Sequence, residues 1–310
     1  MLVVMMHSGL GNDWPAISAL RMPLYFVLSG LFFKDYGSFY NLLEKKINKL
    51  LVPFIFFFMI GLVIYWITNR AIYFYPFYVP FVNNYVINFP IWFLISLFEI
   101  NLIFCAISLN VHSIKYQFLI VSIIGGIGFL LSIKNIYLPL FLVSSFDALP
   151  FFFVGYLLRK TPILYPNKYD KFNLLISITI LCACIYFAVI LNNPHIDFLF
   201  TDYYGNPLTI YILSTGLVLG FLLLCKSIIW LPIISYCGRY SIIILGLHME
   251  YIDLIRRYIG ITDALTLFIL SITLCFICIP IMRAYVPKFV AQTDLLSLPR
   301  FKKLQIFRKV

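Results

Sequence analysis

Charged residues are scarce in this 310-residue chain: Asp, Glu, Lys and Arg make up 11% of it, against 63% hydrophobic residues. A soluble globular domain carries about 25% charged residues and roughly half apolar ones. The polar side chains are therefore too few to cover a soluble globule, and the mean hydropathy is +0.98. These values exclude an ordinary soluble domain and predict that a lipid bilayer surrounds most of the chain.

Acidic residues are the scarcer of the two charged classes, with 12 Asp and Glu against 23 Lys and Arg and a net charge of +11. A basic excess can indicate nucleic-acid binding. In a chain this apolar, it is typical of cytoplasmic loops that hold a membrane protein in place. We therefore expect membrane lipids as partners and no nucleic acid.

The seven cysteines are few and all lie in or beside apolar runs. Cys275 and Cys278 have CxxC spacing, but they lie inside the apolar stretch ITLCFICIPIM without a second pair. A zinc site needs about four ligands. We interpret the cysteines as small buried hydrophobic side chains, and we assign no metal site and no bound cofactor.

Apolar runs recur along the whole chain. A helix needs about 20 apolar residues to cross a bilayer. The first segment, MLVVMMHSGLG, is far too short, and a full first span would need roughly ten to fifteen more residues before Met1. The sequence predicts a single all-α domain over 1–310, a polytopic membrane helical bundle of about ten transmembrane helices with the first one truncated. The other nine expected spans lie at about 22–33, 51–68, 91–109, 117–133, 138–158, 172–191, 207–225, 240–255 and 264–283.

The positions of Lys and Arg predict the orientation. If the 34–50 loop is cytoplasmic and the spans alternate, 18 of the 23 Lys and Arg residues lie inside and 5 outside. We expect a multi-pass protein of the cell membrane with both termini in the cytoplasm. The tail over about 284–310 ends in PRFKKLQIFRKV, which is expected on the inner leaflet. The loop NNPHIDFLFTDYYGN has no basic residue and is expected outside.

Polar groups inside apolar helices are expensive, so each is a candidate site residue. His7 ends the first apolar segment and could accept a proton at neutral pH, but it could equally be a capping or interfacial residue. Ser29 and Gly30 interrupt the 22–33 helix, and Gly allows close approach of another backbone. We expect this pair mainly to pack the helix against the His7 helix. Pro23 suits the first turn of that helix.

Two lysines precede the 51–68 span in the stretch LLEKKINKLLVPF. Lys46 and Lys49 are three residues apart, which places them on one face of a helix. Beside a cavity they could bind phosphate groups. As a plain topology signal, they need no further function.

Three further polar or aromatic residues leave two interpretations each. Glu99 lies within an apolar span and could bind substrate or pair with a neighbouring helix. Trp92 in PIWFL could pack against a sugar face or belong to an interfacial aromatic belt. Arg239 in CGRYS could donate hydrogen bonds to a substrate or serve as a topology charge.

Six segments occur in a recognisable order: VVMMHSG, RMPLYFVLSGLFFK, LLEKKINKLLVPF, PIWFL, LPFFFVGYLLRK and YCGRYSIIILGLH. In these segments the chain resembles the acyltransferase-3 family of membrane O-acyltransferases, especially its fucose-acetylase-like and polysaccharide O-acetyltransferase members. The resemblance covers nearly the whole chain.

The resemblance implies that His7 is the catalytic histidine and that Lys46 and Lys49 stand where relatives carry two arginines. It places Ser29 in the second-helix motif and His248 at the end of a late-helix motif, both as candidate substrate contacts. Relatives also carry a basic residue about three turns before the histidine, which would lie before Met1. The implied donor is acyl-CoA, most simply acetyl-CoA, and the implied acceptor is a glycan or lipid-linked glycan.

Two other functions fit the composition. A multi-pass transporter or flippase of lipid-linked sugars or small solutes would use ionisable residues at the membrane midplane and paired broken helices. No matching pair of broken segments occurs in the two halves of the chain. The other alternative is a scaffold without catalytic activity.

Overall fold

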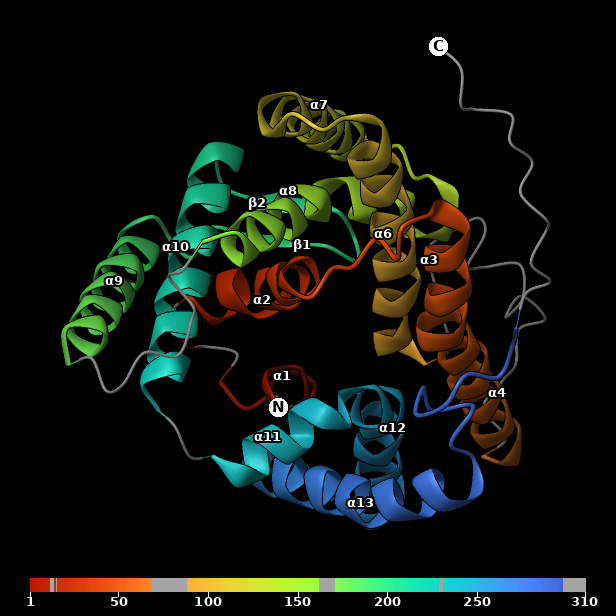
Figure 1. Ribbon diagram of the computed structural model, residues 1–310. Helices are drawn as coiled ribbons and strands as arrows, with labels where there is room; N and C mark the ends of the chain where they lie inside the picture. Colours follow the sequence, from red (N-terminus) through yellow and green to blue (C-terminus); the bar gives the residue numbers. More distant parts are fainter. Residues whose placement is uncertain (12–13, 15, 69–87, 162–170, 229–230, 298–310) are drawn as a thin grey trace.

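A computed structural model describes residues 1–11, 14, 16–68, 88–161, 171–228 and 231–297. These residues are mostly helical, with one short two-stranded hairpin (Figure 1). The predicted tail segment 299–310 lies outside the described residues. The elements in chain order are α1 (Leu2–Ser8), α2 (Ile17–Leu31), α3 (Phe39–Lys46), the π-helical turn η1 (Ile47–Leu51), α4 (Val52–Ile67), the 3₁₀ turn η2 (Phe89–Ile91), α6 (Trp92–Asn110), α7 (Ile114–Ile133), the 3₁₀ turn η3 (Pro139–Phe141), α8 (Leu142–Arg159), α9 (Lys171–Ile190), β1 (His195–Asp197), β2 (Asp202–Tyr204), α10 (Pro207–Ser227), α11 (Pro232–Arg239), α12 (Ser241–Leu254), the π-helical turn η5 (Ile255–Ile259) and α13 (Ala264–Tyr285).

The predicted all-α membrane bundle is confirmed. Among the described residues, 7 helices are long and apolar enough to cross a membrane: Phe39–Ile67, Phe89–Asn110, Ile114–Ile133, Pro139–Arg159, Phe172–Ile190, Pro207–Ser227 and Ala264–Tyr285. Large apolar side chains are exposed along α7, α9 and α13, including Phe118, Leu175 and Ile269. A contiguous apolar exterior of this kind suits lipid rather than water. The chain is a multi-pass membrane protein.

Helix α2 packs on α8 through two glycines. A Cβ at Gly30 would lie 1.8 Å from the carbonyl oxygen of Phe152, and a Cβ at Gly155 would lie 1.9 Å from that of Val27. The backbones of α2 and α8 therefore touch, which only glycine permits. The expected packing role of Gly30 holds, but the expected partner was wrong, because the close contact is with α8 and not with the helix of His7.

The start of α2 also differs from the prediction. The helix begins at Ile17, five residues before the expected start at 22, and Pro23 lies inside it rather than in its first turn. Proline lacks the N–H that would bond the carbonyl four residues earlier. The early start matters for function because it adds Arg21 to the helix.

The segment after α13 returns to the turn between α3 and α4. Asn48 of η1 is 1% exposed, and its Oδ1 accepts hydrogen bonds from the backbone N–H groups of Leu295 and Leu296 at 2.7 and 2.8 Å. Its Nδ2 donates to the carbonyl oxygen of Leu296 at 2.8 Å. One buried amide thus ties the chain beyond α13 to the π-helical turn.

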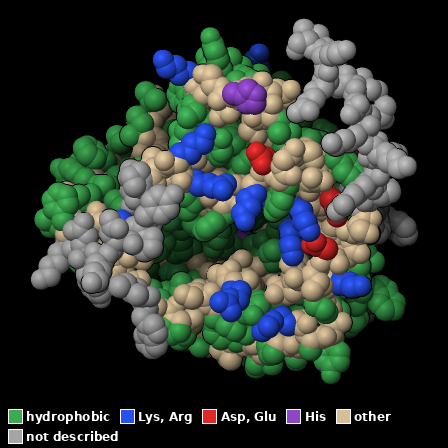
Figure 2. Space-filling view, viewed as in Figure 1, with side chains coloured by type: hydrophobic (Ala, Val, Ile, Leu, Met, Phe, Trp, Pro, Cys, Tyr) green, Lys and Arg blue, Asp and Glu red, His purple; other side chains and the backbone are tan. Residues whose placement is uncertain are grey.

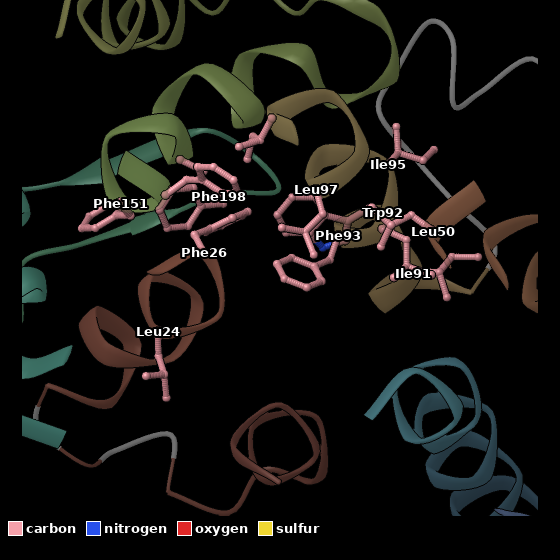
Figure 3. Packing of buried hydrophobic residues seen from close by; sticks show 14 of the residues in the cluster. Leu24, Phe26, Leu50, Ile91, Trp92, Phe93, Ile95, Leu97, Phe151 and Phe198 are labelled. Atoms are coloured by element: carbon pink, nitrogen blue, oxygen red, sulfur yellow. The ribbon is translucent and has the colours of Figure 1, made fainter. Parts of the chain in front are cut away.

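Helix α1 lies between two parts of the bundle. It packs on α12 and α13, and in Figure 1 it faces α2 from the side of these helices. The other part of the bundle consists of α2, α6 and α8, whose aromatic side chains form a large part of the buried core (Figure 3). Phe26 of α2 contacts Phe93 of α6 with ring centroids 5.2 Å apart, and Phe33 contacts Phe104 at 5.1 Å. The middle of α2 thus lies against the start of α6, and the residue that follows α2 by two positions lies against a later turn of α6.

Candidate active site

A cavity of about 690 Å³ lies between these two parts of the bundle. Its walls come from α1, α2, the α3–η1 junction, η2, α6, the β1–β2 hairpin, α11 and α12. Figure 2 shows a hollow in the middle of the viewed face, with Lys and Arg side chains gathered around it. Five of the site residues predicted from the sequence line the cavity: His7, Ser29, Lys46, Trp92 and His248.

The end of α1 holds His7 at one end of the cavity. The helix stops there because Gly9 adopts a left-handed conformation with φ of 92° and its N–H donates to Met6 O. Arg256 of η5 donates to the carbonyl oxygens of His7 and Ser8, both at 3.2 Å. A guanidinium at a helix C-terminus stabilises the free carbonyls and the negative end of the helix dipole. The backbone of His7 is thus fixed, while its ring lines the cavity.

His248 of α12 lies beside His7, with ring centroids 5.3 Å apart. Its side chain is fully buried, and its Nδ1 lies 2.8 Å from the carbonyl oxygen of Ile244. Because a carbonyl only accepts, Nδ1 carries the hydrogen, and Nε2 of the neutral ring is an acceptor. Among the described residues, nothing pairs with Nε2. Helices α1 and α12 therefore present two neighbouring imidazoles to the cavity, one of them with a buried acceptor that has no hydrogen-bond partner among the described residues.

Arg21 lines the cavity, whereas the sequence analysis counted it only among the 5 Lys and Arg residues expected outside. Arg21 lies near the start of α2, which is the end of that helix closest to His7. Among the described residues, its buried Nε has no hydrogen-bond partner. Helical spacing places Arg21 in line with cavity residues further along α2 and at its C-cap, namely Tyr25, Leu28, Ser29 and Phe32. That periodicity could have identified Arg21 had the helix been predicted to begin at Ile17.

The β1–β2 hairpin covers the same end of the cavity. Residues 195–200 all line it, and the two strands pair antiparallel with Ile196 opposite Tyr203. Tyr203 fixes the hairpin to the bundle, because its hydroxyl donates to Oδ1 of Asp147 at 2.8 Å. Burial, above all, raises the pKa of the Tyr203 phenol, which keeps it a donor. The sequence predicted a loop here, and the hairpin was not expected.

The opposite end of the cavity carries Lys46 but not Lys49. Lys46 lines the cavity, and among the described residues it makes no ion pair. Lys49 instead donates to the carbonyl oxygen of Ala291 at 2.6 Å and lies 3.8 Å from Asp294, which also pairs with Lys45. The prediction that Lys49 shares the face of Lys46 was wrong, because the π-helical turn begins between them and winds fewer degrees per residue than an α-helix.

Two more predicted substrate contacts lie outside the cavity lining. Glu99 of α6 accepts a hydrogen bond from the Ser145 hydroxyl of α8 at 2.6 Å. That contact is the pairing with a neighbouring helix that the sequence left open, and the substrate role is corrected. Arg239 is the exposed last residue of α11, and the cavity is lined instead by its neighbours Cys237 and Gly238.

The position of Trp92 decides between its two interpretations, a contact with a sugar face and a place in the interfacial aromatic belt. It is 6% exposed and packs against Phe93 and Phe141 with ring centroids 6.3 and 5.8 Å apart. A side chain this buried does not belong to a lipid-facing aromatic belt, so that interpretation was wrong. Trp92 lines the cavity near His7, because Phe89, three residues earlier, contacts the His7 ring at 6.2 Å.

Comparison with known protein families shows to which family the chain with this cavity belongs. The sequence model of the acyltransferase-3 family, described as an acyltransferase domain, matches residues 1–283. The chain belongs to this family. Its members are membrane acyltransferases, and the family therefore favours acyl transfer over the transporter alternative. Comparisons with curated proteins and with solved structures gave no match.

The family match covers every element that lines the cavity, from α1 to α12. Among the described residues, no group of three or more His, Cys, Asp or Glu side chains could hold a metal ion. The imidazole and charged side chains that this acyltransferase brings together in the cavity are the imidazoles of His7, His248 and His195, the guanidinium of Arg21, the carboxylate of Asp197 and, at the other end, the ammonium of Lys46.

Proposed function

We propose that this protein is an O-acetyltransferase, which moves an acetyl group from cytoplasmic acetyl-CoA to a hydroxyl of a glycan or lipid-linked glycan on the other side of the cell membrane. The observation that supports this most is the continuity of one cavity, lined by Lys46 at one end and by His7 and His248 at the other. The lysine-rich side is the cytoplasmic one in the orientation that the positive-inside rule predicts.

Lys46 is the proposed donor contact. CoA carries several phosphate negative charges, and an ammonium group without an ion-pair partner in a mainly apolar cavity is suited to bind them. Lys45 and Lys49 are already engaged by Asp294. The acyl end of the arm then extends through the cavity toward the imidazoles.

His7 is the proposed general base. It takes the proton from the acceptor hydroxyl as that oxygen attacks the thioester carbonyl carbon and a C–O bond forms. When the tetrahedral intermediate collapses, the C–S bond breaks, and the CoA thiolate takes the proton from the His7 imidazolium. Positioned general bases contribute about 10²–10⁴-fold to rate.

Arg21 and His248 are proposed to assist at the same end. Arg21 has a buried N–H without a partner among the described residues, and it would donate to the oxyanion that forms from the thioester carbonyl. The free Nε2 of His248 is an acceptor, suited to a second hydroxyl of the sugar. Trp92 and Phe93 offer aromatic faces against which sugar C–H groups can pack.

The Lys46 assignment is tested by a matched pair of variants. Lys46→Met should raise KM for acetyl-CoA about tenfold, the usual effect of losing one charged contact, with a smaller change in kcat. Lys49→Met should leave KM within about twofold, because that ammonium contacts Ala291 and Asp294 instead. Equal effects of the two changes, or a larger effect of Lys49→Met, would contradict the proposed donor site.

A further inference from the structure

The cavity also contains a buried amide that the proposed function does not yet use. Asn101 of α6 lines the cavity and is 2% exposed. Its Nδ2 donates to the carbonyl oxygen of Leu97 at 2.7 Å, one turn earlier on the same helix. Its Oδ1 has no hydrogen-bond partner among the described residues. A buried acceptor without a partner costs free energy, so a ligand that donates to it gains affinity.

The depth of Asn101 follows from the contacts between α2 and α6. The Phe26–Phe93 contact lies toward His7, and the Phe33–Phe104 contact lies toward the other end. Asn101 is one turn before Phe104, so it lies on the side of the cavity away from His7. Helices α3 and η1, which carry Lys46, pack directly against α6.

The cavity is long enough to hold these groups one after another. Its lining along α2 runs from Arg21 to the C-cap Phe32, eleven residues further on, which is about 16 Å at the rise of an α-helix. Between these ends the lining on α2 and α6 is mostly apolar, including Leu28, Leu94 and Leu97. A polar group passing through this stretch meets few partners, and Asn101 Oδ1 is an unpaired one.

We propose that Asn101 binds an amide N–H of the pantetheine arm of the acyl-CoA donor, and so holds the arm between Lys46 and the imidazoles. This inference rests on the proposed function. The arm carries two secondary amides between its phosphate and its sulfur, and each offers one N–H donor. An amide that loses its water in an apolar channel needs a new partner, and the Asn101 carboxamide oxygen supplies one.

The experiment measures binding rather than turnover, so it needs no glycan. Purified protein in detergent is titrated with CoA and with adenosine 3′,5′-bisphosphate, which lacks the arm. Asn101→Leu should weaken CoA binding about tenfold and leave the nucleotide affinity unchanged. The matched control is Asn110→Leu, because exposed Asn110 at the end of the same helix makes the same bond to the carbonyl four residues earlier, at 2.7 Å.

A change in the ligand tests the same contact without altering the protein. Two CoA analogues, each with one pantetheine amide replaced by an ester, lack one N–H apiece. One of them should bind the wild type about tenfold more weakly than CoA, and should bind Asn101→Leu no more weakly than CoA does. Such coupling identifies the N–H that Asn101 accepts.

The outcomes separate the two proposals. Unchanged CoA affinity in Asn101→Leu, equal losses for CoA and the nucleotide, or no ester effect on the wild type would overturn the role of Asn101 and leave the proposed function standing. Absence of CoA binding by the wild type would overturn the acyl-CoA donor itself, and the role of Asn101 with it.

Discussion

Replacing Gly30 by alanine is expected to push α2 away from α8. The added Cβ would lie 1.8 Å from Phe152 O, whereas ordinary van der Waals contact begins at 3.4 Å, so the two backbones must separate by about 1.6 Å. Overpacked sites typically lose about 1–3 kcal/mol. We expect about 3 kcal/mol here, because the opposing atom is a backbone carbonyl that no side-chain rotation can move.

Gly126→Ala is the matched control, because Gly126 is also helical but an added Cβ there meets nothing within 4 Å. That change should stabilise by up to about 1 kcal/mol through helix propensity. Gly155→Ala should resemble Gly30→Ala, since its Cβ would lie 1.9 Å from Val27 O. The double variant should cost less than the sum, because both glycines serve one contact.

The assay is the thermal unfolding midpoint in detergent at one fixed heating rate, read by fluorescence-detected size exclusion. The fixed rate matters because membrane proteins often unfold irreversibly. Gly30→Ala and Gly155→Ala should melt well below the wild type, and Gly126→Ala at or above it. A midpoint for Gly30→Ala equal to that of Gly126→Ala would refute the direct backbone contact between α2 and α8.

Two further predictions concern the ends of helices. Asn48→Ala should speed proteolysis within residues 286–297, because three hydrogen bonds tie that segment to Asn48. The control Asn41→Ala, on the exposed part of α3, should leave the proteolysis rate unchanged, because that side chain bonds within its own region, to Tyr36. Hydrogen bonds from Thr266 lower the pKa of Asp263, so its stabilisation of α13 is present above the unfolded pKa of about 3.9 and lost as pH falls through the folded value. Asp263→Asn should therefore flatten the fall of the melting midpoint between about pH 5 and pH 3, and an unchanged fall would contradict this role.

The helical bundle could be predicted from the sequence because lipid imposes one rule on every span. Apolar runs of helical length appear as helices along the described chain, and the segment of His7 is as short as its sequence suggested. His7, Ser29, Lys46, Trp92 and His248 also share one cavity. Residues like these are costly in lipid, so their presence in apolar segments already pointed inward.

The wrong predictions concern places where the backbone departs from a regular α-helix, or where distant parts of the chain determine which residues are in contact. Lys49 was misplaced by a π-helical turn, which spacing alone does not reveal. Gly30 was correctly read as a close-contact residue, but its partner α8 lies more than a hundred residues away in the sequence. Arg21 was missed because the predicted start of α2 excluded it.

The central claim is that one cavity lets His7 use an acetyl group that enters at the Lys46 end. The most direct measurement is transfer of labelled acetyl from acetyl-CoA to glycan by the purified enzyme in proteoliposomes, comparing wild type, His7→Ala and the exposed-histidine control His112→Ala. His7→Ala should lose at least about 100-fold of the transfer rate with an unchanged melting midpoint, while His112→Ala keeps the wild-type rate. Transfer by His7→Ala at the wild-type rate would contradict the claim.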